Sequence, residues 1–296
     1  MHDRIRQFKV LVECRSFTDA AKKLRLSQPA LSVALTKLEK ELGTPLIWRG
    51  ATYFEVTAAG QLVYDYAADA QARHQSLYSG LAELGNHKQQ VRVGMIDSVA
   101  TIFCDDNRLL ELFEQRYSLS LMVDNSRTLL EKVRRAELDY AVVVSQPGPQ
   151  VPKNIEQQMI GYEVLLDVTL AKQWYADERL ISYNYGSTTY SIVEQAFKDF
   201  SLLPFQPETY STSPEAMLRL VLAGRGHAVL PLSLVDSYVV AGTLLLYPLG
   251  RDGYVRRSLS LIYRQPHKSV AIIRQRLTKI LAAQNRQAER LVSVDD

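Results

Sequence analysis

Apolar residues at helical spacing mark three successive segments within the first 43 residues. The stripes are Ile5, Phe8, Leu11 and Val12, then Ala20, Ala21 and Leu24, then Leu31, Leu35, Leu38 and Leu42. Thr18 is expected to cap the second helix and Ser27 the third, whose first turn tolerates Pro29. Gly43 is expected to end that third helix. The pattern predicts a compact unit of three short helices.

Two short β-prone runs follow, "PLIWRG" and "YFEVT", and they flank Gly50. Runs rich in β-branched and aromatic residues on either side of a glycine are typical of a hairpin. We therefore expect a small wing after the three helices. The first domain is then predicted to cover residues 1–57.

A helical pattern without proline extends from residue 58 to about residue 88. Its positions recur every seven residues in two interleaved rows, Val63, Ala70, Leu77 and Leu84 with Ala67, His74 and Leu81. A sustained seven-residue period is typical of a coiled-coil seam, which needs a second helix. Residues 58–88 are therefore predicted to form a linker helix that makes a homodimer. The alternative is that the stripe packs on the protein's own body.

Residues 91–296 alternate strand and helix patterns in a loose internal repeat. The first copy holds strands "VRVGMI", "LSLMV" and "DYAVVV" with helices "LLELFEQRY" and "LLEKVRRAEL". The second holds strands "RLISYN", "ETY" and "HAVLP" with helices "IVEQAFKDF" and "EAMLRLVLAG". Such alternation predicts an α/β fold with parallel-rich sheets. We expect two lobes around a cleft, lobe I at about 91–162 and 266–296 and lobe II at about 163–265.

The net charge of +3 is concentrated at the N-terminus. Residues 1–49 hold ten Lys and Arg against five Asp and Glu, residues 50–90 hold two against four, and residues 91–296 hold 23 against 23. A basic end on a neutral body indicates a module that binds a polyanion. No apolar run reaches the ~20 residues that cross a bilayer, and the N-terminus lacks a signal peptide's apolar core. We therefore expect a cytoplasmic protein without membrane contact.

The third helix has a face suited to reading DNA, because the first residues of a recognition helix meet base edges in the major groove. Gln28 can pair with adenine, Ser32 can bond a base or a phosphate, and Val33 can touch a thymine methyl group. Lys22 and Lys23 are phosphate candidates whose alternative is a solvated charge. With a helix-turn-helix at about 17–36, the predicted DNA contacts are Thr18, Ser27, Gln28, Pro29, Ser32, Val33, Thr36, Lys37 and Arg49.

This N-terminal pattern resembles the LysR-type transcriptional regulators. The matching positions are Phe8, Ser16-Phe17-Thr18, Ala20-Ala21, Leu24, Ser27-Gln28-Pro29-Ala30-Leu31-Ser32, Leu38-Glu39, Leu42-Gly43, Leu46, Arg49, Thr57 and Ala59-Gly60. "DNSRTLLEKVRRAELDYAVV" and "STSPEAMLRLVLAGRGHAVLP" resemble the family's two effector-domain signatures more weakly. The resemblance implies a winged helix-turn-helix, a dimerising linker helix and a two-lobed, periplasmic-binding-protein-like effector domain, commonly in a homotetramer. It implies a DNA-binding regulator controlled by a small molecule, and no enzyme.

The recognition helix departs from the resemblance at a few positions. Val33 and Ala34 stand where members often carry a basic or long polar residue, and Ile47 stands where phenylalanine is common. The wing segment "GATYFE" has no positive charge, where the family often has a basic wing. We therefore expect this helix to rely on Gln28, methyl contacts and DNA shape more than on arginine–guanine pairs.

Several turns in residues 91–296 place small polar side chains before predicted helices. Free N–H groups and the dipole at a helix N-terminus favour an anion, so turns that face one cleft would hold a carboxylate. The resemblance adds that the turns after the first two strands line the family's effector site. The predicted effector contacts are Ser98, Thr101, Asn125, Ser126, Ser187, Thr188 and Thr212. The alternative for each is a helix cap.

Two other interpretations stay open. A two-lobed binding protein or an enzyme could carry the N-terminal helices only as an oligomerisation arm, although no interpretable catalytic set or metal cluster supports an enzyme. A regulator without an effector would fill its cleft with side chains such as Phe103 or Tyr210. Cys14 and Cys104 are too far apart in sequence to suggest a disulfide framework or zinc site. Cys104 and His227 are expected to be structural, and no cofactor is expected.

Overall fold

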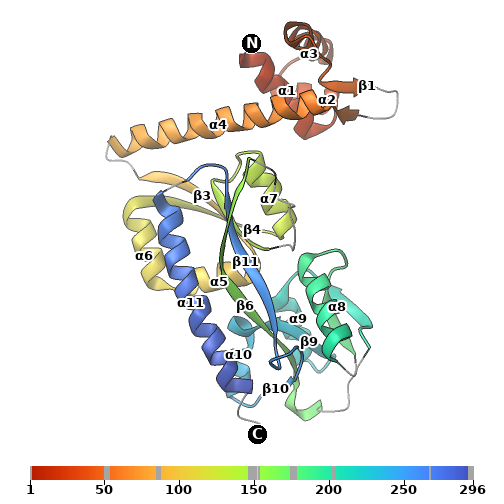
Figure 1. Cartoon of the computed structure of the whole chain (residues 1–296), viewed down its shortest axis with the longest axis vertical. Helices are drawn as coiled ribbons and strands as arrows, with labels where there is room; N and C mark the ends of the chain where they lie inside the picture. The colour runs from red at the N-terminus through yellow and green to blue at the C-terminus, as the bar shows by residue number, and fades with distance from the viewer. Residues whose placement is uncertain are drawn as a thin grey trace. The chain divides into compact units, whose positions relative to one another are not determined.

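The computed structural model describes residues 2–49, 54–84, 88–145, 152, 154–173, 179–201, 204–266 and 268–292. Its contacts divide the chain into two compact units (Figure 1). Unit 1 holds Met1–His87 with Arg134–Ala136, and unit 2 holds Lys88–Val133 with Glu137–Asp296. The three-helix module, the wing and the long helix thus share one unit, and both predicted lobes share the other.

Unit 1 begins with helices α1 (His2–Cys14), α2 (Phe17–Leu24) and α3 (Gln28–Leu42). The expectation that Thr18 caps α2 is wrong: Ser16 adopts the extended backbone of a cap, and its Oγ accepts a hydrogen bond from the Asp19 N–H at 3.3 Å. Ser27 caps α3 as expected, accepting from the Ala30 N–H at 3.3 Å. Gly43 ends α3 with a φ of +68°, as expected.

The leucine stripe of α3 faces the core of unit 1. Leu31, Leu35 and Leu38 are buried there with Phe8 of α1, whereas Leu42 is exposed at the end of the helix. Burying these large side chains supplies most of the favourable free energy that holds the three helices together. The opposite face of α3 is thereby left to solvent.

The predicted wing is present as strands β1 (Ile47–Arg49) and β2 (Phe54–Val56), which pair antiparallel with Ile47 opposite Val56. Residues 50–53, where the predicted turn lies, fall outside the described residues. Helix α4 (Ala58–Leu84) begins directly after the wing. The end of the predicted 58–88 helix cannot be compared, because residues 85–87 are also outside the described part.

The seven-residue stripe of α4 has a buried part and an exposed part. In its first turns Ala67 is buried in the unit 1 core and Val63 packs against that core, so the alternative interpretation holds there. Beyond Ala70 the stripe residues whose side chains are described are exposed: His74, Leu77 with 57% of its surface open to solvent, and Leu81 with 52%. An apolar stripe that leaves its own core and continues into solvent is typical of a helix that pairs with another chain.

Unit 2 is built on one mixed sheet. Its strands are β3 (Gln89–Met95), β4 (Tyr117–Val123), β5 (Tyr140–Val144), β6 (Glu156–Leu170), β7 (Leu180–Tyr183), β8 (Pro207–Ser211), β9 (His227–Pro231), β10 (Leu244–Tyr247) and β11 (Val255–Tyr263). Among the described residues the order is β4-β3-β5-β11-β6-β9-β7-β8, with β10 on β6. The strands within each predicted repeat run parallel, whereas β6 and β11 pair antiparallel with their neighbours.

Two apolar cores lie along this sheet. The first packs α5 (Asp97–Asp105), α6 (Asn107–Arg116) and α7 (Ser126–Arg134) on β3, β4 and β5. The second packs α8 (Thr188–Phe200), α9 (Pro214–Leu222) and α10 (Leu232–Val240) on β7 and β9. A 3-10 turn, Ala171–Gln173, follows β6. These cores are the two lobes of the α/β fold.

Three elements belong to both lobes. Strands β6 and β11 cross from one core to the other, so Leu259–Tyr263 lie in the first core although the sequence pattern assigned them to lobe II. Helix α11 (Lys268–Val292), which the sequence pattern assigned entirely to lobe I, runs along unit 2 and reaches the second core at Ala288 (Figure 1). The lobes are therefore joined by two paired strands and a helix rather than by single crossings.

The sequence pattern also misassigned the segment after β3. It predicted a turn containing Ser98, whereas α5 already begins at Asp97. The helix was missed because it is short, nine residues from Asp97 to Asp105, and no side-chain cap precedes its buried residues Val99, Ala100, Ile102 and Phe103. A periodic pattern over so few residues does not distinguish a helix from a strand.

Candidate functional site

The solvent face of α3 carries most of the predicted DNA contacts. Gln28, Pro29, Thr36 and Lys37 are exposed and Ser32 is half-buried, on the side away from the leucine stripe. Val33 stands among them with 53% of its surface exposed. An exposed valine amid polar groups has no role in the unit 1 core, which leaves it available to a thymine methyl group.

Two predicted contacts are engaged within the protein. The Ser27 hydroxyl caps α3, and the Thr36 Oγ1 donates to the Ser32 carbonyl at 3.0 Å. Thr18 is exposed in the first turn of α2. Arg49 ends β1, and its side chain lies outside what the structure describes. Gln28, Ser32 and Val33 therefore remain the polar and methyl groups that α3 offers first.

The wing is tied to α3 by the carboxylate of Glu39, a residue that matches the family pattern but whose role the sequence did not indicate. Glu39 Oε1 accepts hydrogen bonds from the Leu46 N–H at 2.9 Å and the Ile47 N–H at 3.5 Å. Thr57 closes the other end, because its Oγ1 donates to the Pro45 carbonyl at 2.8 Å and accepts from the Gly60 N–H at 2.9 Å. These contacts fix the start of the wing and of α4 against α3.

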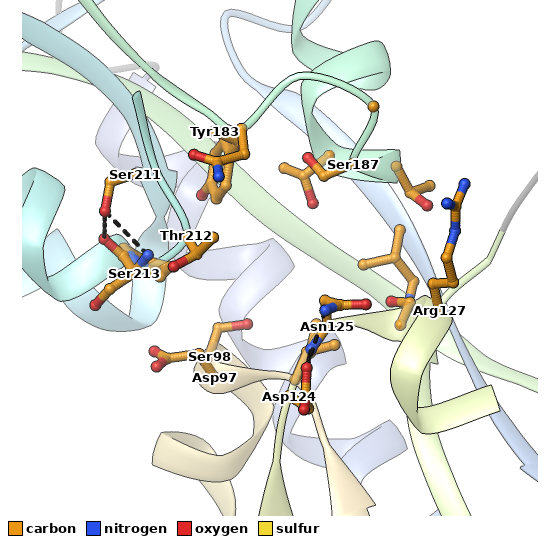
Figure 2. A pocket seen from close by; sticks show the side chains of 18 of the residues that line it. Asp97, Ser98, Asp124, Asn125, Arg127, Tyr183, Ser187, Ser211, Thr212 and Ser213 are labelled. Carbon is orange, nitrogen blue, oxygen red and sulfur yellow. Dashed lines mark hydrogen bonds between the residues drawn. The ribbon is translucent and has the colours of Figure 1, made fainter. Parts of the chain in front are cut away.

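A cleft of about 650 Å³ lies between the two lobes of unit 2 (Figure 2). Strand ends and the first turns of α5, α7, α8 and α9 line it, as expected for crevices at the carboxyl ends of parallel strands. Its volume is within the range of small-molecule sites. Of the predicted effector contacts, the structure brings together Ser98, Asn125, Ser126, Ser187, Thr188 and Thr212.

Thr101 does not join them. Because α5 begins at Asp97, Thr101 lies a full turn into the helix, where it is exposed and its Oγ1 donates to the Asp97 carbonyl at 3.2 Å. A regulator without an effector was expected to fill its cleft with side chains such as Phe103 or Tyr210, and the structure does not place either of them there. Phe103 is fully buried in the first core, Tyr210 is half exposed, and neither lines the cleft.

Several cleft side chains already serve the fold. Asn125 Oδ1 caps α7 by accepting from the Thr128 N–H at 3.0 Å, and Ser187 Oγ caps α8 by accepting from the Tyr190 N–H at 3.1 Å. Ser126 Oγ accepts from the Val144 N–H at 3.0 Å. The capping alternative is thus correct for Asn125 and Ser187, and both still line the cleft. Helix α5 differs, since Ile96 before it makes no side-chain cap.

The floor of the cleft holds an arginine that sequence reasoning missed. Arg257 of β11 is 3% exposed and donates from Nε to Oε2 of Glu163, its cross-strand neighbour on β6, at 2.6 Å. It also donates to Thr189 Oγ1 of lobe II at 2.7 Å and to Ser98 Oγ of lobe I at 2.9 Å. One guanidinium group therefore bridges both lobes.

Burial alone would lower the pKa of Arg257, but the carboxylate of Glu163 more than offsets this, and the pKa is raised. The guanidinium is thus a permanent positive charge, neutralised by Glu163. No sequence signal identified the pair, because Glu163 and Arg257 lie 94 residues apart and only the β6–β11 register brings them together.

Two further cleft groups have shifted pKa values. Burial, reinforced by the charge of Glu215, raises the pKa of Asp97 against the opposing effect of Arg257. Burial raises the pKa of the Tyr183 hydroxyl to about 12, so this phenol stays protonated at neutral pH. Tyr183 is 7% exposed, and its hydroxyl has no hydrogen-bond partner among the described residues. The hydrogen-bonding capacity of this hydroxyl is therefore unused within the described part of the chain.

Two residues singled out in the sequence lie outside these two surfaces. His227 is buried, and its Nδ1 lies 2.8 Å from Oδ1 of Asp167 in lobe II, whereas Cys104 is exposed on α5. Within the described residues, no group of three or more His, Cys, Asp and Glu could hold a metal ion. No described helix is long and apolar enough to cross a membrane.

Comparison with known proteins matches both units. Residues 2–61 match the model of the bacterial regulatory helix-turn-helix proteins of the LysR family, and residues 85–282 match the LysR substrate-binding domain. The chain is 27% identical over 289 residues to the transcriptional activator CmpR of Synechocystis, covering 93% of each chain.

Solved structures share the fold. The crystal structure of ArgP from Mycobacterium tuberculosis aligns with a TM-score of 0.67 at 19% identity, over 95% of this chain and 96% of that one. DarR of Vibrio fischeri, solved in complex with DNA, aligns with a TM-score of 0.52 at 18% identity, over 95% and 99%. With two family models covering most of its length, this chain belongs to the LysR family of helix-turn-helix transcription regulators.

Proposed function

We propose that this regulator binds double-stranded DNA as a homo-oligomer and responds to a small molecule held in the cleft of unit 2. The exposed face of α3 supports the DNA-binding part most directly, because its polar and methyl groups have no role in the unit 1 core. The cleft at four helix beginnings supports the second part, with an anionic group of the ligand facing their N–H groups. The protein then acts on chromosomal DNA in the cytoplasm and has no catalytic role.

The mechanism that follows is a shift between two populations of the oligomer. A ligand that contacts both lobes binds better to one relative orientation of the lobes than to the other. Because α4 pairs two copies in this proposal, a change in unit 2 packing alters the spacing of the two α3 helices on DNA. The arrangement is proposed to be a homotetramer built from two such dimers.

The recognition face is tested by Gln28→Ala combined with Ser32→Ala. We expect this variant to lose specific affinity for its own promoter by about 10–100-fold, since each good base contact contributes about 1–3 kcal/mol. Affinity for unrelated DNA should change little. Fluorescence anisotropy at one fixed salt concentration measures both affinities.

Lys37→Ala is the matched control, since a phosphate contact weakens binding to all sequences alike. We expect it to lower both affinities together and to leave their ratio unchanged. An unchanged ratio in the Gln28/Ser32 variant would show that α3 reads DNA through other residues.

The α4 stripe is tested by Leu77→Glu combined with Leu81→Glu. Two charges on an apolar seam cannot be buried without a large desolvation cost, so we expect the linker dimer to dissociate and DNA affinity to fall sharply. Light scattering coupled to size-exclusion chromatography reads the molecular mass. Leu62→Glu, an exposed leucine of α4 outside the seven-residue rows, should leave the mass unchanged. Equal masses for all three proteins would refute pairing through this stripe.

A further inference from the structure

Two opposite charges line the cleft without an ion-pair or hydrogen-bond partner for their charged groups among the described residues. Asp97 is the first residue of α5, and Arg127 lies in the first turn of α7. Both side chains are exposed. Figure 2 shows them at different sides of the cavity, with Arg127 on α7 and Asp97 beside Ser98. A ligand in the cleft therefore meets a free negative charge in one place and a free positive charge in another.

The other charges that line the cleft are already engaged. Arg257 is neutralised by Glu163 and uses its remaining contacts on Ser98 and Thr189. Asp124 Oδ1 accepts from the Asn125 N–H at 2.7 Å and from the Asn125 side-chain amide at 2.9 Å. A ligand that replaced either set of contacts would destabilise the fold. A ligand that binds Asp97 and Arg127 displaces only the water around their charged groups.

Tyr183 adds an uncharged polar anchor near Asp97. Its hydroxyl is buried, unpartnered within the described part of the chain, and close enough for the Asp97 charge to act on it. Tyr183 lines the cleft from the end of β7 (Figure 2). A buried hydroxyl without a partner destabilises the fold, and a ligand that bonds to it would recover that loss.

We propose that the cleft selects a dipolar ligand of the α-amino acid class, with its ammonium group at Asp97 and its carboxylate at Arg127. This inference rests on the proposed function and specifies the ligand of that site. The Tyr183 oxygen accepts from the ammonium group, and the Arg127 guanidinium pairs with the carboxylate near the beginnings of α7 and α8.

Simpler ligands fit the same charges less well. A dicarboxylate would place a negative group beside Asp97, and like charges at short range disfavour each other. A simple amine would leave Arg127 and the N–H groups of the helix beginnings without an anion. A cavity of about 650 Å³ accommodates amino acids with large side chains as well as small ones.

The test begins with the full-length protein and the twenty proteinogenic amino acids, each added singly in a thermal-shift assay. For the amino acid that stabilises the protein most, two matched compounds are then used, its des-amino acid and its carboxamide. Isothermal titration measures the affinity of all three for the natural protein and for Asp97→Asn and Arg127→Gln.

Each variant should lose affinity only for ligands that carry the matching charge. Asp97→Asn is expected to lower the affinity for the amino acid and for its carboxamide by about tenfold or more. The affinity for the des-amino acid should not change. Arg127→Gln should lower the affinity for the amino acid and for the des-amino acid, and it should leave the affinity for the carboxamide unchanged. Arg127→Lys, which keeps the charge, should recover part of the loss.

Three outcomes would overturn the inference. The first is stabilisation of the protein by simple carboxylates but by no amino acid. The second is an Asp97→Asn variant whose affinity for the des-amino acid falls as much as its affinity for the amino acid. The third is an Arg127→Gln variant in which no affinity changes. Each leaves the regulator itself intact, because promoter binding and its response to a ligand are measured separately. Failure of the proposed function would instead appear as loss of specific promoter binding by the unmodified protein.

Discussion

Replacing Arg257 with methionine is expected to lower the free energy of unfolding by about 3–5 kcal/mol. The substitution leaves the Glu163 carboxylate 1% exposed and without its counter-charge, and it removes the donor to Ser98 and Thr189. A buried charge without a partner is among the costliest single defects a fold can carry. Urea denaturation followed by circular dichroism measures the loss as a lower midpoint.

A double variant separates the cost of the unpaired charge from a loss of packing. Arg257→Met with Glu163→Leu places two apolar side chains in the same buried space, so most of the lost stability should return. Glu163→Gln alone should behave like Arg257→Met, because the guanidinium is then the uncompensated group. If the double variant were as unstable as the two single variants, the ion pair would not be the source of the effect.

The arginine pair also bears on how the lobes move. Its hydrogen bonds reach α5 in one lobe and α8 in the other from the strand that crosses between them. A double variant that is stable but has lost these bonds should open and close without them. We expect its ligand affinity, measured by isothermal titration, to differ from that of the natural protein, because Arg257 lines the floor of the cleft and its bonds connect both lobes.

Gly60→Ala is expected to cost about 1–3 kcal/mol or more and to abolish DNA binding at growth temperature. A Cβ at this position would lie 2.0 Å from the Leu46 carbonyl oxygen and 2.8 Å from Val56 Cγ1. Since the Leu46 oxygen is backbone, the wing or the start of α4 would have to move. Thermal unfolding and promoter binding of the full-length variant measure the two effects.

Gly43→Asn is the matched control, because Gly43 serves the backbone conformation at the end of α3 rather than a close approach. Gly43 has a φ of +68° and no neighbour within 4 Å of an added Cβ. Asparagine tolerates this left-handed backbone better than other residues with a side chain, so the cost should stay below about 1 kcal/mol with DNA binding retained. Equal losses at Gly43 and Gly60 would show that backbone conformation, rather than close approach, explains both glycines.

The helix-turn-helix was the part most fully predicted from sequence. The apolar stripe of α3, its Ser27 cap and its Gly43 end are all local features, and each is where the pattern placed it. The one local error was the cap of α2. Ser16 and Thr18 are both residue types that cap helices well, so the local pattern does not decide at which of them α2 begins. The connection between α1 and α2 decides this, and Ser16 is the cap.

The cleft was predicted only in part. Sequence reasoning identified polar residues at the beginnings of α7, α8 and α9, because caps leave a local signature. It misplaced Thr101, because α5 is short and Ile96, the residue before it, makes no side-chain cap. It did not identify Asp97, Arg127 and Tyr183, which line the cleft and which we propose as ligand groups, since none of them is unusual in sequence.

The amino-acid order by itself determined the succession of modules: three short helices, a wing, a long helix and two repeated α/β segments. Periodicity and capping are short-range properties, so they can be read along the chain. Only the tertiary structure decided which groups share a site. The pairing of β6 with β11 placed Glu163 beside Arg257, and the same sheet brought Asp97, Arg127 and Tyr183 to one cleft. Long-range register depends on the whole fold, and therefore the chemistry of the cleft does too.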